Sequence, residues 1–156
     1  MKLIIVSVGH RMPDWITVGY NEYVKRMPRE AQIVLQEIKP EPRTTGKTTT
    51  QIMEAEAQRI LSALPQNCLR IALDERGPQP TTKQLAAQMQ DWMREGCDVA
   101  FIIGGADGLH ASVKQTARQM MALSALTLPH AFVRVLLAEQ LYRAHSLMHN
   151  HPYHRE

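Results

Sequence analysis

The side chains best suited to chemistry in this 156-residue chain lie near its C-terminus. Glu139 and Arg143 are four residues apart inside an apolar run, so on a helix they project from one side in the favourable acid-before-base order. Tyr153, His154 and Arg155 follow in a tail, where chain ends normally fray. His154 could transfer a proton near neutral pH, and Arg155 with Arg143 could hold an anionic substrate. We therefore favour a tail that docks over a site.

Two other interpretations of the tail stay open. The first is a metal site, because His145 and His149 add further imidazoles to this region. No cysteine or carboxylate constellation at a familiar spacing accompanies them, so we assign no metal ligand. A solvated tail is the plainer alternative, because terminal segments are commonly disordered.

A second candidate site begins at the glycine pair Gly104-Gly105, which ends an apolar strand. The missing side chains let a backbone or a ligand approach closely, but GGADG matches neither GxGxxG nor GxxxxGK[ST], and a plain tight turn is about as well supported. Leu73 and residues 123–128 also lie at expected strand ends. Ligands of open α/β sheets gather outside the carboxyl ends of the strands. The residues alone thus predict a small-molecule cleft.

Strand and helix patterns alternate along the chain, which predicts an α/β fold with a mostly parallel sheet covered on both faces. The expected strands are residues 2–8, 33–38, 68–73 and a central strand from 99. The expected helices are residues 14–27, one from about 50, 83–95 and 130–148. Pro129 suits the start of the last helix, because its missing N–H would have no intrahelical partner. Residues 39–50 contain two prolines, five threonines and three basic residues, which predicts a mobile loop that is either an inert connection or an RNA contact.

The composition is that of one globular domain, with 44% apolar and 21% charged residues. A net charge of +3 is a mild bias toward anionic partners. Cys68 and Cys97 show neither the CxxC nor the Cys/His spacing of metal-binding and redox motifs, which indicates reduced thiols in the core. The N-terminal apolar run is shorter than a signal-peptide core, and no uncharged run reaches the ~20 residues that cross a bilayer. We expect a soluble cytoplasmic protein.

Four segments of the chain resemble the RlmH family. They are LIIVSVGHRMPDW, IIGGADGLH, LSALTLPHAFVRVLLAEQLYRA and the terminal NHPYHRE. Members of this family are small SPOUT-class methyltransferases that modify a pseudouridine of bacterial 23S, or large-subunit, ribosomal RNA at N3. The match runs from end to end and implies one SPOUT methyltransferase domain over residues 1–156.

The resemblance also implies a C-terminal trefoil knot that holds S-adenosylmethionine. It further implies a homodimer in which the last helix lies near the interface and the tail of one subunit completes the site of the other. Carried over by position, the implied cofactor-binding residues are Leu73, Gly104, Gly105, Leu123, Ser124, Ala125, Leu126, Thr127 and Leu128. Backbone groups of the apolar run could hydrogen-bond the adenine edge while leucines cover its faces.

The implied reaction assigns roles to the C-terminal side chains. N3 of pseudouridine carries a proton at neutral pH, so attack on the sulfonium methyl group needs a base and an anion stabiliser. His154, or with less support Glu139, would take the proton, while Arg143 and Arg155 would stabilise the charge or grip the RNA backbone. The expected substrate is the assembled ribosome. A non-catalytic ribosome-binding protein and a nucleotide-binding regulatory module remain the alternatives.

Overall fold

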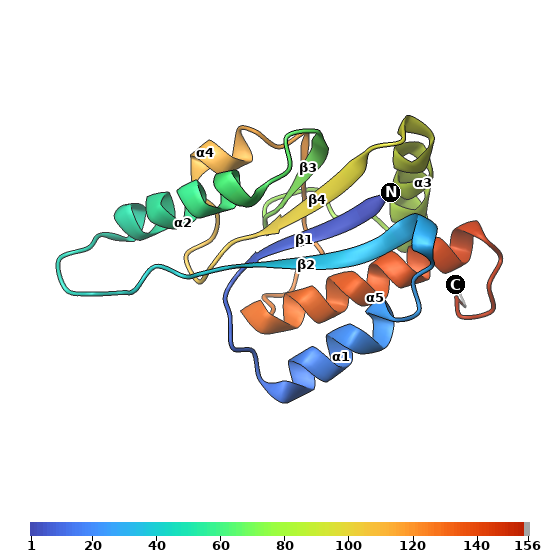
Figure 1. Cartoon of the computed structure of the whole chain (residues 1–156), viewed down its shortest axis with the longest axis horizontal. Helices are drawn as coiled ribbons and strands as arrows, with labels where there is room; N and C mark the ends of the chain where they lie inside the picture. The colour runs from blue at the N-terminus through green and yellow to red at the C-terminus, as the bar shows by residue number, and fades with distance from the viewer. Residues whose placement is uncertain (155–156) are drawn as a thin grey trace.

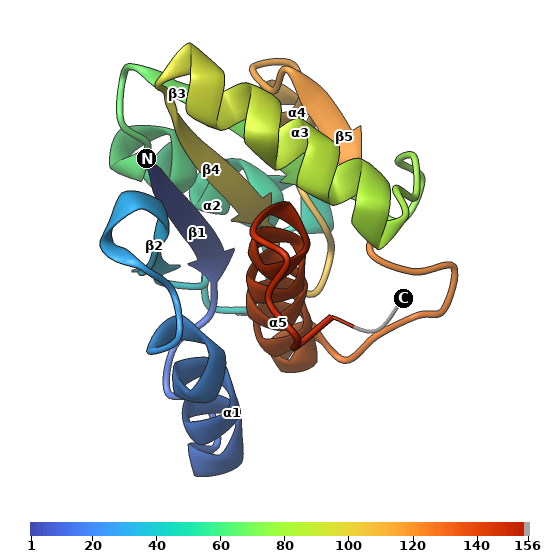
Figure 2. The same cartoon turned by 90° about the vertical axis from the view of Figure 1, so that its right-hand side faces the viewer.

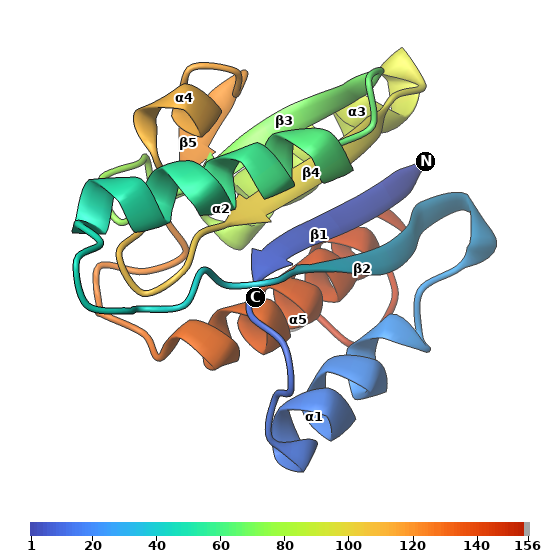
Figure 3. The same cartoon turned by 60° about the vertical axis from the view of Figure 1, so that its left-hand side comes forward.

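The structure is a computed structural model that describes residues 1–154. Five parallel strands form one sheet in the spatial order β2-β1-β4-β3-β5 (Figure 3). The strands are β1 (Lys2–Val8), β2 (Gln32–Ile38), β3 (Cys68–Leu73), β4 (Asp98–Ile103) and β5 (Gln119–Met121). The predicted parallel sheet is therefore confirmed, with β4 at its centre.

Two inner strands of the sheet, β1 and β4, carry buried apolar side chains on both faces. Ile5 pairs with Phe101 and packs with it against one helical layer, whereas Ile4 and Ala100, the preceding pair, face the other layer. A near-continuous apolar run is what a parallel strand needs when helices cover both faces.

Helices cover both faces of the sheet (Figure 1). One face carries α1 (Asp14–Val24), α3 (Thr82–Glu95) and α5 (His130–Met148), and the other carries α2 (Thr49–Ala63) and α4 (Ala111–Lys114). A short 3-10 helix, η1 (Arg29–Ala31), precedes β2. Helix α5 lies between α1 and α3 and contacts both (Figure 2). No helix within residues 1–154 is long and apolar enough to cross a membrane.

Local capping explains where several helices begin and end. Thr48 and Thr81 each form a capping box with the glutamine three residues later, so α2 and α3 start directly after them. Gly96 ends α3 in the left-handed conformation, with φ of 71°. Helix α1 ends before the expected position near Met27, because Arg26 and Met27 donate to carbonyls three residues back and tighten the last turn.

The chain leading into α5 runs beside the loop that follows β3. The Asp74 N–H donates to the Met121 carbonyl at 3.0 Å, and the Ala122 N–H donates to the Pro78 carbonyl at 2.9 Å. A Cβ atom on Gly77 would lie 2.8 Å from the Met121 nitrogen, so this approach requires glycine. These bonds join two loops that are far apart in sequence at the carboxyl ends of the strands.

Candidate active site

A cavity of about 460 Å³ opens where β3, β4 and β5 end. This volume is in the range of small-molecule pockets. Eight of the nine predicted cofactor residues line it: Leu73, Gly104, Gly105, Leu123, Ser124, Leu126, Thr127 and Leu128. Ala125 is the one that does not. The predicted convergence of three strand ends on one cleft is therefore confirmed.

Gly104 and Gly105 shape a turn over residues 104–108 that forms one wall of the cavity. A Cβ on Gly104 would lie 2.6 Å from the Gly108 carbonyl carbon, so the turn can close on itself only without that side chain. A Cβ on Gly105 would lie 2.9 Å from Oε1 of Glu56. The Gly108 N–H donates to the Gly105 carbonyl at 3.0 Å and closes the turn. Residues 104–108 therefore form a tight turn and also line a cavity that a ligand could enter.

Residues 123–128 form the opposite wall with their backbone largely unpaired. Within the described part of the chain they exchange no backbone–backbone hydrogen bonds. One amide, that of Leu126, donates to the Ser124 hydroxyl at 2.9 Å. The Leu126 side chain is 76% exposed. The segment therefore offers free peptide N–H and C=O groups, flanked by apolar side chains, to a ligand in the cavity.

The cavity also has a charged rim that sequence reasoning missed. Lys114 Nζ lies 2.5 Å from Asp74 Oδ2, and this hydrogen bond holds the pKa of Asp74 below its usual range. Asp107 accepts from Arg43 Nη2 at 2.6 Å. The position of Asp74, directly after Leu73, was a usable signal. No motif marks Lys114, because its short helix reaches Asp74 only through the tertiary fold.

The predicted acid and base on the last helix form an ion pair that the tail joins. Glu139 Oε1 accepts from Arg143 Nε at 2.8 Å and from Tyr153 Oη at 3.0 Å. The Arg143 guanidinium lies 4.9 Å from the centre of the Tyr153 ring. Burial, reinforced by the neighbouring Glu139, raises the pKa of Tyr153 to about 12. The last residue described, His154, has a buried Nδ1 with no hydrogen-bond partner within residues 1–154.

This tail cluster and the cavity are separate within one chain. Glu139, Arg143, Tyr153 and His154 do not line the cavity, and Arg155 lies outside the described residues. Val133 of α5 does line it, and at 1.5 Å per residue Arg143 lies about 15 Å further along the helix. Figure 1 shows the tail, in red, near the start of β1, away from the strand ends that form the cavity. The predicted site residues therefore lie in two separate places within one chain, the cavity and the tail cluster.

The tail histidines do not gather around a metal position. His145 and His149 place their ring centres 4.3 Å apart, and burial together with the nearby His149 lowers the pKa of His145. No three metal-ligating side chains come together within residues 1–154.

Comparison with solved structures assigns the class of fold. The chain superposes on a structure described as a probable methyltransferase from Bordetella pertussis with a TM-score of 0.56, at 17% identity, over 92% of this chain and 93% of that one. It superposes on TrmJ from Z. mobilis with a TM-score of 0.51, at 16% identity, over 92% and 70% of the two chains. These neighbours show the fold alone.

The family is shown by sequence. The model described as "Predicted SPOUT methyltransferase" matches residues 1–154, and the chain therefore belongs to the SPOUT methyltransferase family. Among its relatives, the chain is 58% identical to ribosomal RNA large subunit methyltransferase H of Ralstonia pickettii and 59% identical to that of Nitrosomonas eutropha. Each alignment covers 99% of both chains. The resemblance to the RlmH family seen in the sequence motifs is confirmed.

Proposed function

We propose that this chain transfers a methyl group from S-adenosylmethionine to N3 of a pseudouridine in 23S ribosomal RNA. The cavity at the strand ends is the main support for this proposal. Eight of the residues predicted to bind the cofactor line it. End-to-end similarity to proteins named ribosomal RNA large subunit methyltransferase H supports the RNA substrate. A ribosomal substrate would be met in the cytoplasm.

The cavity suits S-adenosylmethionine, which would supply the sulfonium methyl group. The free peptide groups of residues 123–128 can hydrogen-bond the adenine edge, and the leucines among them can cover its faces. The backbone turn at residues 104–108 admits a ligand closely, because no side chain projects from Gly104 or Gly105. Asp74 and Asp107 on the rim are each paired with a cation, Lys114 and Arg43, so these two pairs add polar groups to the rim without net charge.

The residues of the tail cluster, Glu139, Arg143, Tyr153 and His154, have different roles in the proposed reaction. Glu139 already accepts hydrogen bonds from Arg143 and Tyr153, whereas Nδ1 of His154 has no partner among the described residues. His154 would take the N3 proton. Tyr153, with its pKa raised to about 12, stays protonated and acts as a donor. Arg143, together with Arg155, would stabilise the developing negative charge on the ring or hold the RNA backbone.

A homodimer would bring the two groups of residues together. The tail of one chain is remote from its own cavity, so a partner's tail would complete the site. Trp15 and Val18 on α1, the helix that packs beside α5, are 62% and 68% exposed. An apolar surface of this kind suits a partner. We therefore assign the α1 and α5 layer to the dimer interface.

The proposal includes one domain over residues 1–156 with a C-terminal trefoil knot. The close contact between the loop after β3 and the segment entering α5, through Asp74 with Met121 and Pro78 with Ala122, is the arrangement that a threaded segment would need. The shared five-stranded sheet supports a single domain.

The function is tested by methyl transfer from labelled S-adenosylmethionine to free 23S RNA, isolated large subunits and assembled ribosomes. We expect one pseudouridine to be labelled, with assembled ribosomes as the best substrate. Ribosome binding without affinity for S-adenosylmethionine would indicate the non-catalytic alternative. Tight binding of a dinucleotide in its place would indicate the regulatory alternative.

A further inference from the structure

The loop between β2 and α2, residues 39–48, projects beyond the carboxyl ends of the strands (Figure 1 and Figure 3). From residue 42 onward it is exposed to solvent throughout. It lies at the end of the sheet where the cavity opens. A target nucleotide entering the cavity would carry its neighbouring nucleotides past this loop.

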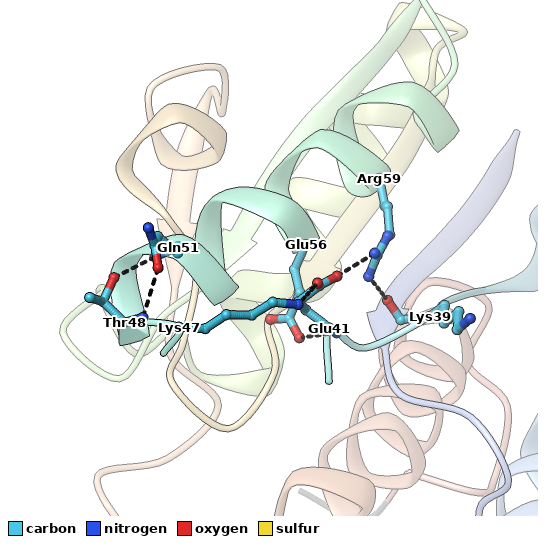
Figure 4. Close-up of polar contacts among 7 residues, drawn as sticks. All are labelled: Lys39, Glu41, Lys47, Thr48, Gln51, Glu56 and Arg59. Carbon is cyan, nitrogen blue, oxygen red and sulfur yellow. Dashed lines mark hydrogen bonds and ion pairs between the residues drawn. The ribbon is translucent and has the colours of Figure 1, made fainter. Parts of the chain in front are cut away.

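The base of the loop is held in place by buried and half-buried polar groups (Figure 4). Glu41 forms ion pairs with Lys47 and Arg59, and these cations hold the pKa of Glu41 below its usual range. The Glu41 N–H donates to Oε2 of Glu56 at 3.1 Å, and Arg59 Nη1 donates to the Lys39 carbonyl at 3.0 Å. Glu56 is only 6% exposed. The two ends of the loop are therefore held in place, which lowers the entropic cost of binding a ligand.

Two contacts connect the loop to the cavity wall. Arg43 Nη2 donates to Oδ2 of Asp107 at 2.6 Å, and Asp107 lines the cavity. The carboxylate of Glu56, which accepts from the loop, also packs beside Gly105. The loop thus forms part of the rim at which a substrate would enter.

The chemistry of the loop suits phosphate. It carries three basic residues against one acidic residue, and its Thr44 and Thr45 hydroxyls are exposed. The side chain of Arg43 is 57% exposed, and one of its nitrogens holds Asp107. The remaining guanidinium donors are available to a phosphate oxygen. Arginine, lysine and hydroxyl side chains are the usual partners of nucleic-acid backbones.

We propose that the 39–48 loop is an RNA-binding surface, in which Arg43 contacts a backbone phosphate next to the target nucleotide. The inference rests on the proposed function and names the part of the chain that holds its substrate. An arginine already positioned by Asp107 at the cavity rim would set the register of the RNA without reading its bases.

The test compares Arg43→Gln with Arg94→Gln. Arg94 is a matched control, because it is an exposed arginine that also pairs with one aspartate, Asp91, at the end of α3 and away from the cavity. Binding to assembled ribosomes that lack the methyl group is measured by co-sedimentation at several salt concentrations, and binding to protein-free 23S RNA is measured in parallel. Cofactor affinity is measured separately by calorimetry with S-adenosylmethionine.

Arg43→Gln should weaken ribosome binding about threefold to tenfold and reduce the logarithmic salt slope by about 0.7 to 0.9, as loss of one phosphate contact requires. Arg94→Gln should match the wild type. Asp107→Asn keeps the Arg43 guanidinium but removes the carboxylate that positions it, so this variant should weaken RNA binding less than Arg43→Gln and should leave the salt slope unchanged. Equal losses of RNA affinity in Arg43→Gln and Asp107→Asn would mean that Arg43 only stabilises the turn at residues 104–108 through Asp107. That result would overturn the proposal.

Two further outcomes separate the remaining explanations. A loss seen with ribosomes but not with protein-free RNA, at an unchanged salt slope, would assign the loop to a ribosomal protein and overturn the proposal. Absence of methyl transfer by the wild-type protein would refute the proposed function alone, since the binding comparison does not depend on catalysis.

Discussion

Arg143 and Tyr153 share one carboxylate oxygen, Oε1 of Glu139, at 2.8 and 3.0 Å. This relationship fixes the C-terminal tail to the helix from which it emerges. The Gln140 side chain donates to the other oxygen, Oε2, at 2.8 Å, so both oxygens of Glu139 have donors, which favours a role in positioning Arg143 and Tyr153 over one in proton abstraction.

Replacing Tyr153 with phenylalanine removes one of these donors and keeps the ring. Because a hydrogen bond to a charged group is worth about 1.5–3 kcal/mol, we expect methyl transfer to fall about tenfold or more. Affinity for S-adenosylmethionine should not change, since Tyr153 does not line the cavity. Tyr142→Phe is the control, because its ring packs 4.6 Å from that of Tyr153 without involving Glu139. Equal activities of the two variants would refute the role assigned to the shared oxygen.

The cavity is tested by Gly104→Ala. The new Cβ would clash with the backbone of Gly108 at 2.6 Å, so the turn must open and cofactor affinity should fall at least tenfold. Calorimetry with S-adenosylmethionine measures the loss, and circular dichroism checks the fold. Gly19→Ala is a matched control, because its Cβ would lie 3.4 Å from Val135 within a helix. Unchanged affinity in a folded Gly104→Ala protein would remove this turn from the site.

Sequence reasoning succeeded where strong local signals mark an element. Helix α5 runs from His130 to Met148 as predicted, because Pro129 precedes its apolar run, and β3 spans residues 68–73 as predicted. Gly96 and Thr81 bound α3 for equally local reasons. The cavity-lining residues were predicted in part from the rule on strand ends and in part from a family resemblance, while their role in binding a cofactor stays a prediction.

What the sequence did not reveal depends on contacts between distant residues. Strand β5 has three residues and α4 has four, too few to display a period, and neither is among the elements predicted from the sequence. The pairs Lys114 with Asp74 and Arg43 with Asp107 join segments that only the fold brings together. Ala125 lies in the predicted binding segment but does not face the cavity.

The ion pair of Arg134 with Glu37 should make the free energy of unfolding depend on which partner is replaced. Arg134 is 2% exposed and donates to Glu37 at 3.0 Å and to the Ser7 hydroxyl at 3.3 Å, whereas Glu37 is partly exposed. Glu37→Ala leaves a buried charge without its partner and should cost about 3 kcal/mol of unfolding free energy. Arg134→Met returns Glu37 to water and should cost only about 1 kcal/mol. Urea unfolding at one protein concentration measures both, and the reverse order would contradict this account.

Tyr20 predicts how stability changes at alkaline pH. Burial raises its pKa to about 12 despite the nearby Arg134, so between pH 10 and 12 the folded chain keeps a proton that the unfolded chain loses. The folded state then binds more protons, and the free energy of unfolding falls as pH rises through this window. Tyr153 titrates in the same window.

Tyr20→Phe should therefore flatten the alkaline decline without abolishing it. At neutral pH the variant should be as stable as the wild type or about 1 kcal/mol more stable, because the buried hydroxyl has no hydrogen-bond partner within the described residues. Urea unfolding across the pH range gives the slope. A slope as steep as that of the wild type would mean that Tyr20 does not titrate there.

In the proposed homodimer, the cavity of one chain works with the tail of the other. A mixed dimer tests it most directly: one chain carries Gly104→Ala, and its differently tagged partner lacks residues 153–156. In this dimer one site receives both defects and the other receives neither. Each parent homodimer should be inactive, and the purified heterodimer should recover about half of the wild-type methyl transfer per dimer. An inactive heterodimer that still associates and binds one equivalent of S-adenosylmethionine would show that cavity and tail act within a single chain.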